Sequence, residues 1–169
     1  KLKKQSFDSS GQNVFFEYDG RLYQKRFNLI GGFQAQNVLM AAALVISLGS
    51  DPQDVFSVLH NLLTVKGRME LAASRANGAN VFVDYAHTPD AIATAITSLR
   101  PHVFGRIIAV IGAGGDRDQS KRPLMGLAAS KNADVVIVTD DNPRSEDPAK
   151  IRQMIIKGIG LGISHEFGD

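Results

Sequence analysis

The sequence contains no cysteine among its 169 residues, which excludes disulfides and thiolate metal sites. It also lacks a strong net charge, because 19 basic residues oppose 17 acidic ones and leave a balance of +2. The basic residues are scattered, so the pattern does not indicate a nucleic-acid-binding surface. Long hydrophobic runs are missing as well: the longest, Val38–Leu48, is too short to span a bilayer. We therefore expect a cytoplasmic protein with no nucleic-acid partner and no membrane partner.

The first part of the chain predicts a hairpin followed by helices. Val14–Tyr18 and Arg21–Phe27 are rich in strand-forming residues, and Asp19-Gly20 between them is a two-residue turn signal. Phe33–Leu48 is apolar and rich in alanine, and predicts a mostly buried helix. These elements leave apolar surface uncovered, so we interpret residues 1–66 as the remnant of a preceding domain.

From residue 67 the pattern alternates between strands and helices. Three short apolar strands alternate with helices that begin at proline or serine signals; the strands are 80–84, 107–111 and 135–140, and the helices start at Thr88-Pro89, Ser120 and Asp147-Pro148. This alternation predicts an α/β fold, with a Rossmann-like and mostly parallel sheet flanked by helices over residues 67–169.

Three finer expectations follow for this second part. The five apolar residues at 107–111 predict a strand buried on both faces. The helix that begins at Ser120 is expected to bury Leu124, Leu127 and Ala128. The glycine-rich tail, residues 158–169, is expected to add no closing element.

The strand at 107–111 ends in Gly112-Ala113-Gly114-Gly115, followed by charged residues. Glycines after a strand suggest a dinucleotide site, but Arg117 stands where the third glycine of that fingerprint belongs, and no Walker A lysine follows. An NAD(P)-binding domain of an oxidoreductase is therefore one alternative for this chain. A non-catalytic small-molecule-binding module is another.

Polar residues follow all three predicted strands. They form the words DYAHTPD at 84–90, DRD at 116–118 and DDNPR at 140–144. In a parallel sheet these words would open onto one edge and present arginines, carboxylates, an amide and an imidazole together. Such a mixture suits a ligand with both anionic and cationic groups. For each residue alone, a turn or a helix cap is the competing interpretation.

These words also resemble those of a known family. GRME at 67–70, DYAHTPD, GGDRD with KRPLMG at 114–126, and TDDNPR at 139–144 resemble the Mur ligases, and within them the members that add meso-diaminopimelate. The resemblance implies an ATP- and magnesium-dependent amide ligase of peptidoglycan synthesis. Its substrates would be UDP-MurNAc-L-Ala-D-Glu, meso-diaminopimelate and ATP, and its intermediate an acyl phosphate.

The resemblance also implies roles for individual residues. By position, four match residues that bind ATP in the family: Asn37, Arg68, Asp84 and His87. Five match residues that select diaminopimelate: Arg117, Asp141, Asn142, Pro143 and Arg144. Arginine can grip a carboxylate through two parallel hydrogen bonds, so Arg144 is the natural partner for the carboxylate that diaminopimelate has and lysine lacks.

The sequence departs from the family pattern in places. Gln34 stands where the family usually has asparagine. The family's UDP-sugar domain, its P-loop and its later glycine–lysine–glycine–histidine–glutamate segment do not occur in these residues, and His165-Glu166 lacks the context to replace the last. We thus expect residues 1–66 to be the end of a central ATPase domain, residues 67–169 to be a truncated C-terminal domain, and the chain to hold no catalytic or metal-binding residue. ATP and Mg²⁺ would be bound mainly elsewhere in the parent enzyme.

Overall fold

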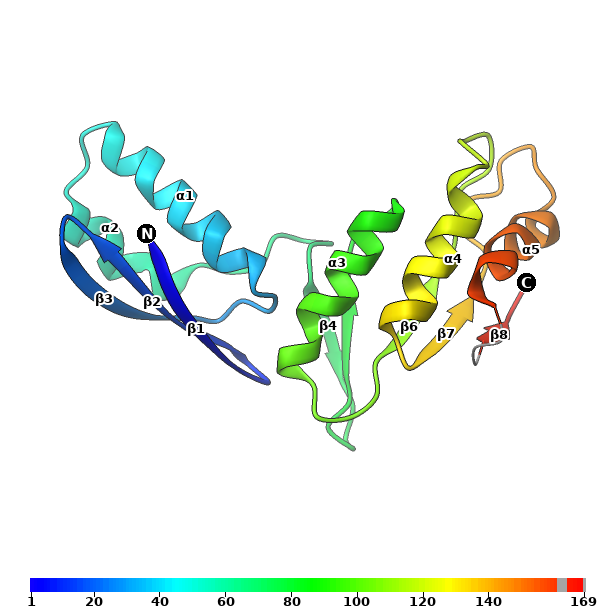
Figure 1. Cartoon of the computed structure of the whole chain (residues 1–169), viewed down its shortest axis with the longest axis horizontal. Helices are drawn as coiled ribbons and strands as arrows, with labels where there is room; N and C mark the ends of the chain where they lie inside the picture. Colours follow the sequence, from blue (N-terminus) through cyan, green and yellow to red (C-terminus); the bar gives the residue numbers. More distant parts are fainter. Residues whose placement is uncertain (161–163, 169) are drawn as a thin grey trace. The chain divides into compact units, whose positions relative to one another are not determined.

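The computed structural model describes residues 1–160 and 164–168, and its chain divides into two compact units (Figure 1). Unit 1 comprises residues 1–85 and 101–103, and unit 2 comprises residues 86–100 and 104–169. Among the described residues, unit 1 contains two antiparallel sheets and unit 2 a parallel one, and each unit has its own set of buried apolar residues. The domain boundary expected near residue 67 stays a prediction.

Unit 1 begins with an antiparallel sheet of three strands in the order β1-β2-β3. The strands are β1 (Leu2–Asp8), β2 (Gly11–Tyr18) and β3 (Arg21–Phe27). Tyr18 pairs with Arg21, so Asp19 and Gly20 alone make the turn, with φ of 47° and 70°. Both values are in the left-handed region that a two-residue hairpin requires. The predicted hairpin is confirmed.

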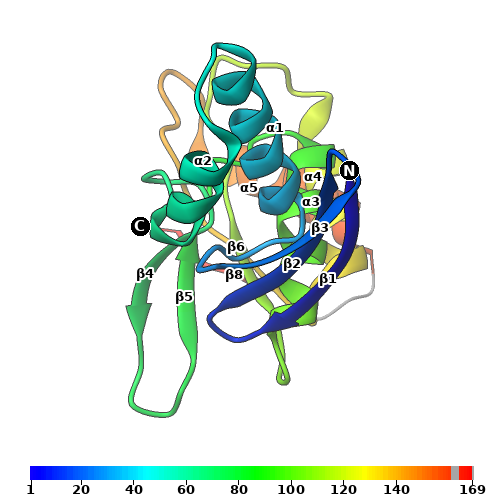
Figure 2. The same cartoon turned by 90° about the vertical axis from the view of Figure 1, so that its left-hand side faces the viewer.

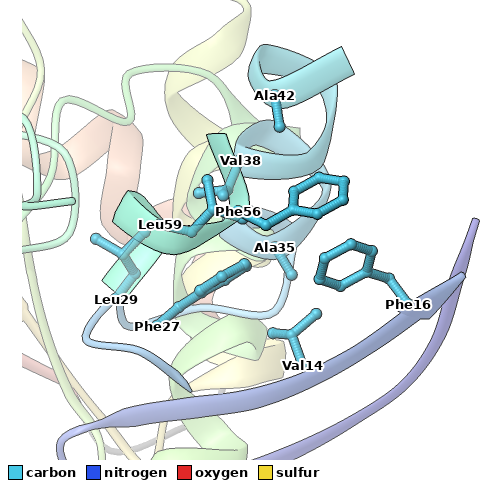
Figure 3. Close-up of a cluster of buried hydrophobic side chains, with 9 residues drawn as sticks. All are labelled: Val14, Phe16, Phe27, Leu29, Ala35, Val38, Ala42, Phe56 and Leu59. Atoms are coloured by element: carbon cyan, nitrogen blue, oxygen red, sulfur yellow. The ribbon is translucent and has the colours of Figure 1, made fainter. Parts of the chain in front are cut away.

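Helices α1 (Phe33–Ser47) and α2 (Pro52–Val58), with the short η1 (Leu59–Asn61), pack on this sheet (Figures 1 and 2). The core between them is drawn in Figure 3 and consists of Val14, Phe16, Phe27, Leu29, Ala35, Val38, Ala42, Phe56 and Leu59. The expectation of a mostly buried helix at 33–48 is wrong, because within unit 1 a single face of α1 meets the sheet. Leu48 is 87% exposed.

Strand β5 (Asn80–Val83) does not join the parallel sheet, so that part of the sequence-based expectation is wrong. It pairs antiparallel with β4 (Glu70–Ser74) in a separate two-stranded sheet of unit 1. A tight turn closes the hairpin, with Gly78 at a φ of 83° and Arg75 N–H donating to the Ala79 carbonyl over 2.8 Å. Because this turn is short, it favours pairing of β5 with β4, the strand just before it in the chain.

Unit 2 contains the parallel sheet, in the order β6-β7-β8. Its strands are β6 (Ile108–Ile111), β7 (Val135–Val138) and β8 (Ser164–Glu166), and both pairs are parallel. The predicted fold class is confirmed. The expectation that the tail adds no element is wrong, because β8 extends the sheet; residues 161–163 and 169 of that tail lie outside the described residues.

Among the described residues, three α-helices accompany the sheet of unit 2: α3 (Pro89–Leu99), α4 (Lys121–Asn132) and α5 (Pro148–Ile159). The short η2 (Arg100–His102) follows α3, and its last two residues belong to unit 1. Helix α4 packs against both α3 and α5. The predicted face of α4 is wrong: Leu124 and Leu127 are exposed, whereas Met125, Gly126 and Ala129 are buried. A side chain at Gly126 would overlap the Ile155 carbonyl, so the small residues face the neighbouring helix.

Helices α3, α4 and α5 all begin at their predicted signals, but a side-chain cap forms at only two of these described starts. Thr88 and Asp147 each accept a hydrogen bond from a backbone N–H of the first turn, as predicted. Ser120 makes no such bond; its hydroxyl donates to Asp118 over 2.6 Å instead, so its predicted capping role is wrong. The Asp118 carboxylate also accepts the Ser120 N–H, and these bonds hold the pKa of Asp118 below its usual range.

The strand at 107–111 was expected to be buried on both faces, and this is wrong within unit 2. Ile107 and Ala109 are buried, whereas Ile108 and Val110 are exposed. Alternate residues of a strand point to opposite faces. One face of β6 therefore packs inward in the described residues.

Candidate functional site

Two loops leave the parallel sheet of unit 2 side by side, at the carboxyl ends of β6 and β7. Ile111 pairs with Val138 at the ends of β6 and β7, and the Thr139 N–H donates to the Ile111 carbonyl over 3.0 Å. We call residues 112–119 the glycine loop and residues 139–147 the DNPR loop. The Gly115 N–H donates to the Asn142 carbonyl over 2.9 Å, so the two loops are also joined beyond the sheet.

The glycines of the first loop permit this close approach. A Cβ at Gly115 would overlap the Pro143 carbonyl, and one at Gly114 would lie 2.7 Å from Arg144 Nη1. In a dinucleotide site, the space beside such glycines admits the pyrophosphate. Here the DNPR loop fills it. The oxidoreductase alternative is therefore not supported.

The structure brings together the five residues matched to amino-acid selection. Arg144 has a φ of 50°, which is uncommon for a residue with a side chain, and its Nη1 donates to the Gly115 carbonyl over 2.6 Å. Asn142 Oδ1 accepts the Arg144 N–H over 3.2 Å, so the turn interpretation holds for that oxygen. Arg117 lies on the facing loop, and both arginines are exposed. Asp141 and Pro143 border Gly112 and Gly115 respectively.

Sequence reasoning missed two residues of this cluster, Arg122 and Glu146. Arg122 has 1% of its side chain exposed and donates to both Glu146 oxygens, over 2.8 and 2.7 Å. This double hydrogen bond, with the Asp116 N–H, lowers the pKa of Glu146 to about 2. A signal existed: Arg122 shares an i, i+3, i+4, i+7 stripe with the small and apolar residues that α4 buries.

A separate pocket of about 420 Å³ lies in unit 1. It contains three of the four residues matched to ATP binding, namely Asn37, Arg68 and Asp84. Most of the remaining lining is apolar and comes from α1 and the 62–65 segment, with Leu29 before α1; Gln34 and Thr64 add two polar side chains. A mostly apolar pocket with a few polar groups is the usual composition of a small-molecule site, and here an amide, a guanidinium and a carboxylate are among those groups.

The β4–β5 hairpin explains how Arg68 and Asp84 come together. Glu70 pairs with Val83, so the residues just before β4 lie opposite those just after β5. The Met69 N–H donates to Asp84 Oδ2 over 2.9 Å, and the Arg68 guanidinium lies 4.6 Å from the centre of the Tyr85 ring. Asp84 thus has a structural contact as well as a place in the pocket.

His87, the fourth residue matched to ATP binding, belongs to unit 2 and directly precedes the cap of α3. Its placement near the ribose stays a prediction. In the part of the chain that the structure describes, no group of three histidines or carboxylates is arranged to hold a metal ion. No helix among these residues is long and apolar enough to cross a membrane.

The parallel sheet of unit 2 and its helices define an α/β protein. Comparison with known proteins gives the family. Residues 67–167 match the family model described as "Mur ligase, glutamate ligase domain". The chain belongs to the Mur ligase family.

Relatives with assigned names agree with this family. The chain is 48% identical over 168 residues to UDP-N-acetylmuramoyl-L-alanyl-D-glutamate–2,6-diaminopimelate ligase of Zymomonas mobilis, covering 99% of the chain and 34% of the relative. It is 49% identical over 160 residues to the enzyme of that name from Caulobacter vibrioides, covering 95% and 32%. The chain spans about a third of the length of these relatives.

Solved structures agree as well. A structure of an enzyme with the same name superposes with a TM-score of 0.69 at 34% identity, covering 99% of the chain and 34% of that structure. The fold and the sequence motifs therefore indicate the same family.

Proposed function

We propose that this chain is the C-terminal part of an ATP-dependent ligase that adds meso-diaminopimelate to UDP-MurNAc-L-Ala-D-Glu. In the proposed reaction, ATP phosphorylates the glutamate side-chain carboxylate, and the amine of diaminopimelate then displaces phosphate to form the amide. Such a reaction requires the ATP pool of the cytoplasm, where we place the enzyme. The relatives that share nearly half of the residues carry the name of this activity.

The observation that carries the amino-acid assignment is the placement of Arg117 and Arg144 on two loops that backbone hydrogen bonds join. Diaminopimelate differs from lysine by one distal carboxylate. Arg144 has guanidinium N–H groups beyond the Nη1 bond to Gly115, and Arg117 adds a second cation on the facing loop. Charge-assisted bonds from a planar guanidinium recognise a carboxylate through both of its oxygens. We assign Arg144 to that carboxylate, with Arg117, Asp141, Asn142 and Pro143 forming its surroundings.

The pocket of unit 1 supports the nucleotide assignment. Its apolar wall suits the adenine face, Asn37 offers an amide for the base edge, and Arg68 offers a cation. We assign Asp84 and His87 to the ribose. Mg²⁺ would be held mainly by other parts of the ligase, through one or two carboxylates and the phosphates of ATP.

Steady-state kinetics of the full-length ligase test the amino-acid assignment. Arg144→Ala should lower kcat/KM for diaminopimelate at least about 30-fold, because truncating one partner of a charge pair that the bound substrate desolvates costs about 2–5 kcal/mol. Lysine has no distal carboxylate to leave unpaired, so its kcat/KM should change little. Lys131→Ala, which removes an exposed cation from the last turn of α4, is the matched control. Equal losses for both substrates would show that Arg144 supports structure alone.

A further inference from the structure

Arg122 and Glu146 form a nearly enclosed ion pair beside the two loops. The side chain of Arg122 is 1% exposed and that of Glu146 is 20% exposed. The two parallel N–H to oxygen bonds fix both the direction and the distance of the carboxylate, which a single contact could not do. The pair joins the first turn of α4 to the DNPR loop, 24 residues further along the chain.

The carboxylate of Glu146 also holds the glycine loop. It accepts the Asp116 N–H over 2.6 Å and the Gln119 side-chain amide over 3.2 Å. Arg122 Nη2 in turn donates to the Gly114 carbonyl over 3.2 Å. Each partner of the pair therefore bonds to the loop that precedes α4 as well as to the other partner.

Backbone strain lies at the same point. Asp116 has a φ of 52°, in the left-handed region that non-glycine residues seldom adopt. Its carboxylate accepts the Ser145 hydroxyl over 2.6 Å, and its N–H is the one bound by Glu146. A strained conformation persists where its surroundings over-determine it, and such residues cluster at ligand-binding sites.

The two candidate substrate-binding arginines are close in sequence to residues held by the Arg122–Glu146 pair. Arg117 directly follows Asp116, and Arg144 lies two residues before Glu146. We propose that the Arg122–Glu146 pair is a positioning element that fixes the spacing of Arg117 and Arg144, and so sets the preference for a second carboxylate on the incoming amino acid. This inference rests on the proposed function and adds to it two residues that touch no substrate.

The pair is not needed simply to fill space. Replacing a buried ion pair by apolar residues of similar volume is often neutral or stabilising, whereas removing one partner leaves an unpaired charge. An apolar pair would keep α4 packed but could not bind the Asp116 N–H or the Gly114 carbonyl. The geometry of the loops, more than the stability of the unit, should depend on the charges.

The test uses the full-length ligase with Glu146→Gln and Arg122→Lys. Each should raise KM for diaminopimelate about tenfold or more, change KM for ATP less than twofold, and lower the preference for diaminopimelate over lysine by a similar factor. Lys121→Gln, which removes the adjacent but exposed cation of α4, should leave all three quantities unchanged. The double variant Arg122→Met with Glu146→Leu should fold with wild-type stability and still show the raised KM for diaminopimelate.

The outcomes separate this proposal from the one on which it rests. If Arg144→Ala abolishes the preference but Glu146→Gln does not shift it, the positioning role is wrong and the proposed function stands. If the double variant restores KM for diaminopimelate, the pair serves packing alone. If the wild-type enzyme does not use diaminopimelate, both proposals are wrong.

Discussion

Gly115 offers the sharpest test of how the two loops depend on each other. In Gly115→Ala the new Cβ would overlap the Pro143 carbonyl oxygen and lie 2.6 Å from its carbon, and both are backbone atoms that cannot rotate away. Ordinary contact requires a displacement of roughly 1 Å between the loops. The bond from the Gly115 N–H to Asn142 and the bond from Arg144 to the Gly115 carbonyl would be strained together.

The expected magnitudes follow from that displacement. Overpacking of this kind costs about 1–3 kcal/mol in the free energy of unfolding. A 1 Å misplacement of a substrate-positioning group can cost about 100-fold in rate. Gly114→Ala is the matched control, because its Cβ meets the end of the flexible Arg144 side chain, which can move.

Two assays measure the effect. Denaturant unfolding of residues 1–169, followed by circular dichroism, gives the change in stability, and kinetics of the full-length ligase give kcat/KM for diaminopimelate. Gly115→Ala should be impaired in both, and Gly114→Ala should keep near-normal stability. If the two variants behave alike, the close contact between the loops does not govern their geometry.

Three further predictions concern the nucleotide pocket, unit 1 and acid stability. Asp84→Ala in the full-length ligase should raise KM for ATP more than KM for diaminopimelate, and the reverse order would place Asp84 in the other site. His102 is buried, accepts the Gly31 N–H over 3.0 Å and contacts a second backbone group. His102→Ala should therefore lower the free energy of unfolding by about 2–6 kcal/mol, at about 1–3 kcal/mol for each of the two stranded groups, whereas the exposed His60→Ala should change it little. The pKa of Glu146 is lowered from 4.5 to about 2, so its stabilisation is present above pH 4.5 and lost as the pH falls from there towards 2. Between pH 4.5 and 2, the free energy of unfolding should fall less steeply with pH in Glu146→Gln than in the wild type. The same slope in both proteins would contradict a contribution of Glu146 to acid stability.

Much of the candidate site could be predicted because its residues lie in short sequence motifs that resemble those of the family. GRME and DYAHTPD gave Arg68 and Asp84, which line the pocket of unit 1, and GGDRD and DNPR gave residues of the two joined loops of unit 2. The binding roles of these residues stay predictions, as does the position of His87 beside the ribose. Arg122 and Glu146 were missed, because a buried charge reveals its role only when its partner's position is known. Their partnership spans 24 residues of sequence and passes through a loop.

The sequence by itself determined the turns and helix caps whose interacting groups lie within a few residues of each other. Asp19 and Gly20 make a turn because their own backbones adopt positive φ, and Thr88 and Asp147 cap helices because their side chains reach the next backbone N–H groups. The alternation of strands and helices was sufficient for the fold class.

Tertiary packing alone decided the features that depend on distant partners. The apolar run at 80–83 suits a parallel strand and a hairpin equally, and pairing with β4 was settled by a short turn. Helix α4 buries Gly126 instead of Leu124 because the backbone of α5 passes too close for a larger side chain. The glycines after β6 looked like a place for a ligand, yet the chain's own DNPR loop occupies it. The spacing of apolar residues predicts that one face of a helix or strand is buried. Which segment covers that face depends on contacts between residues far apart in the sequence, and these exist only in the folded chain.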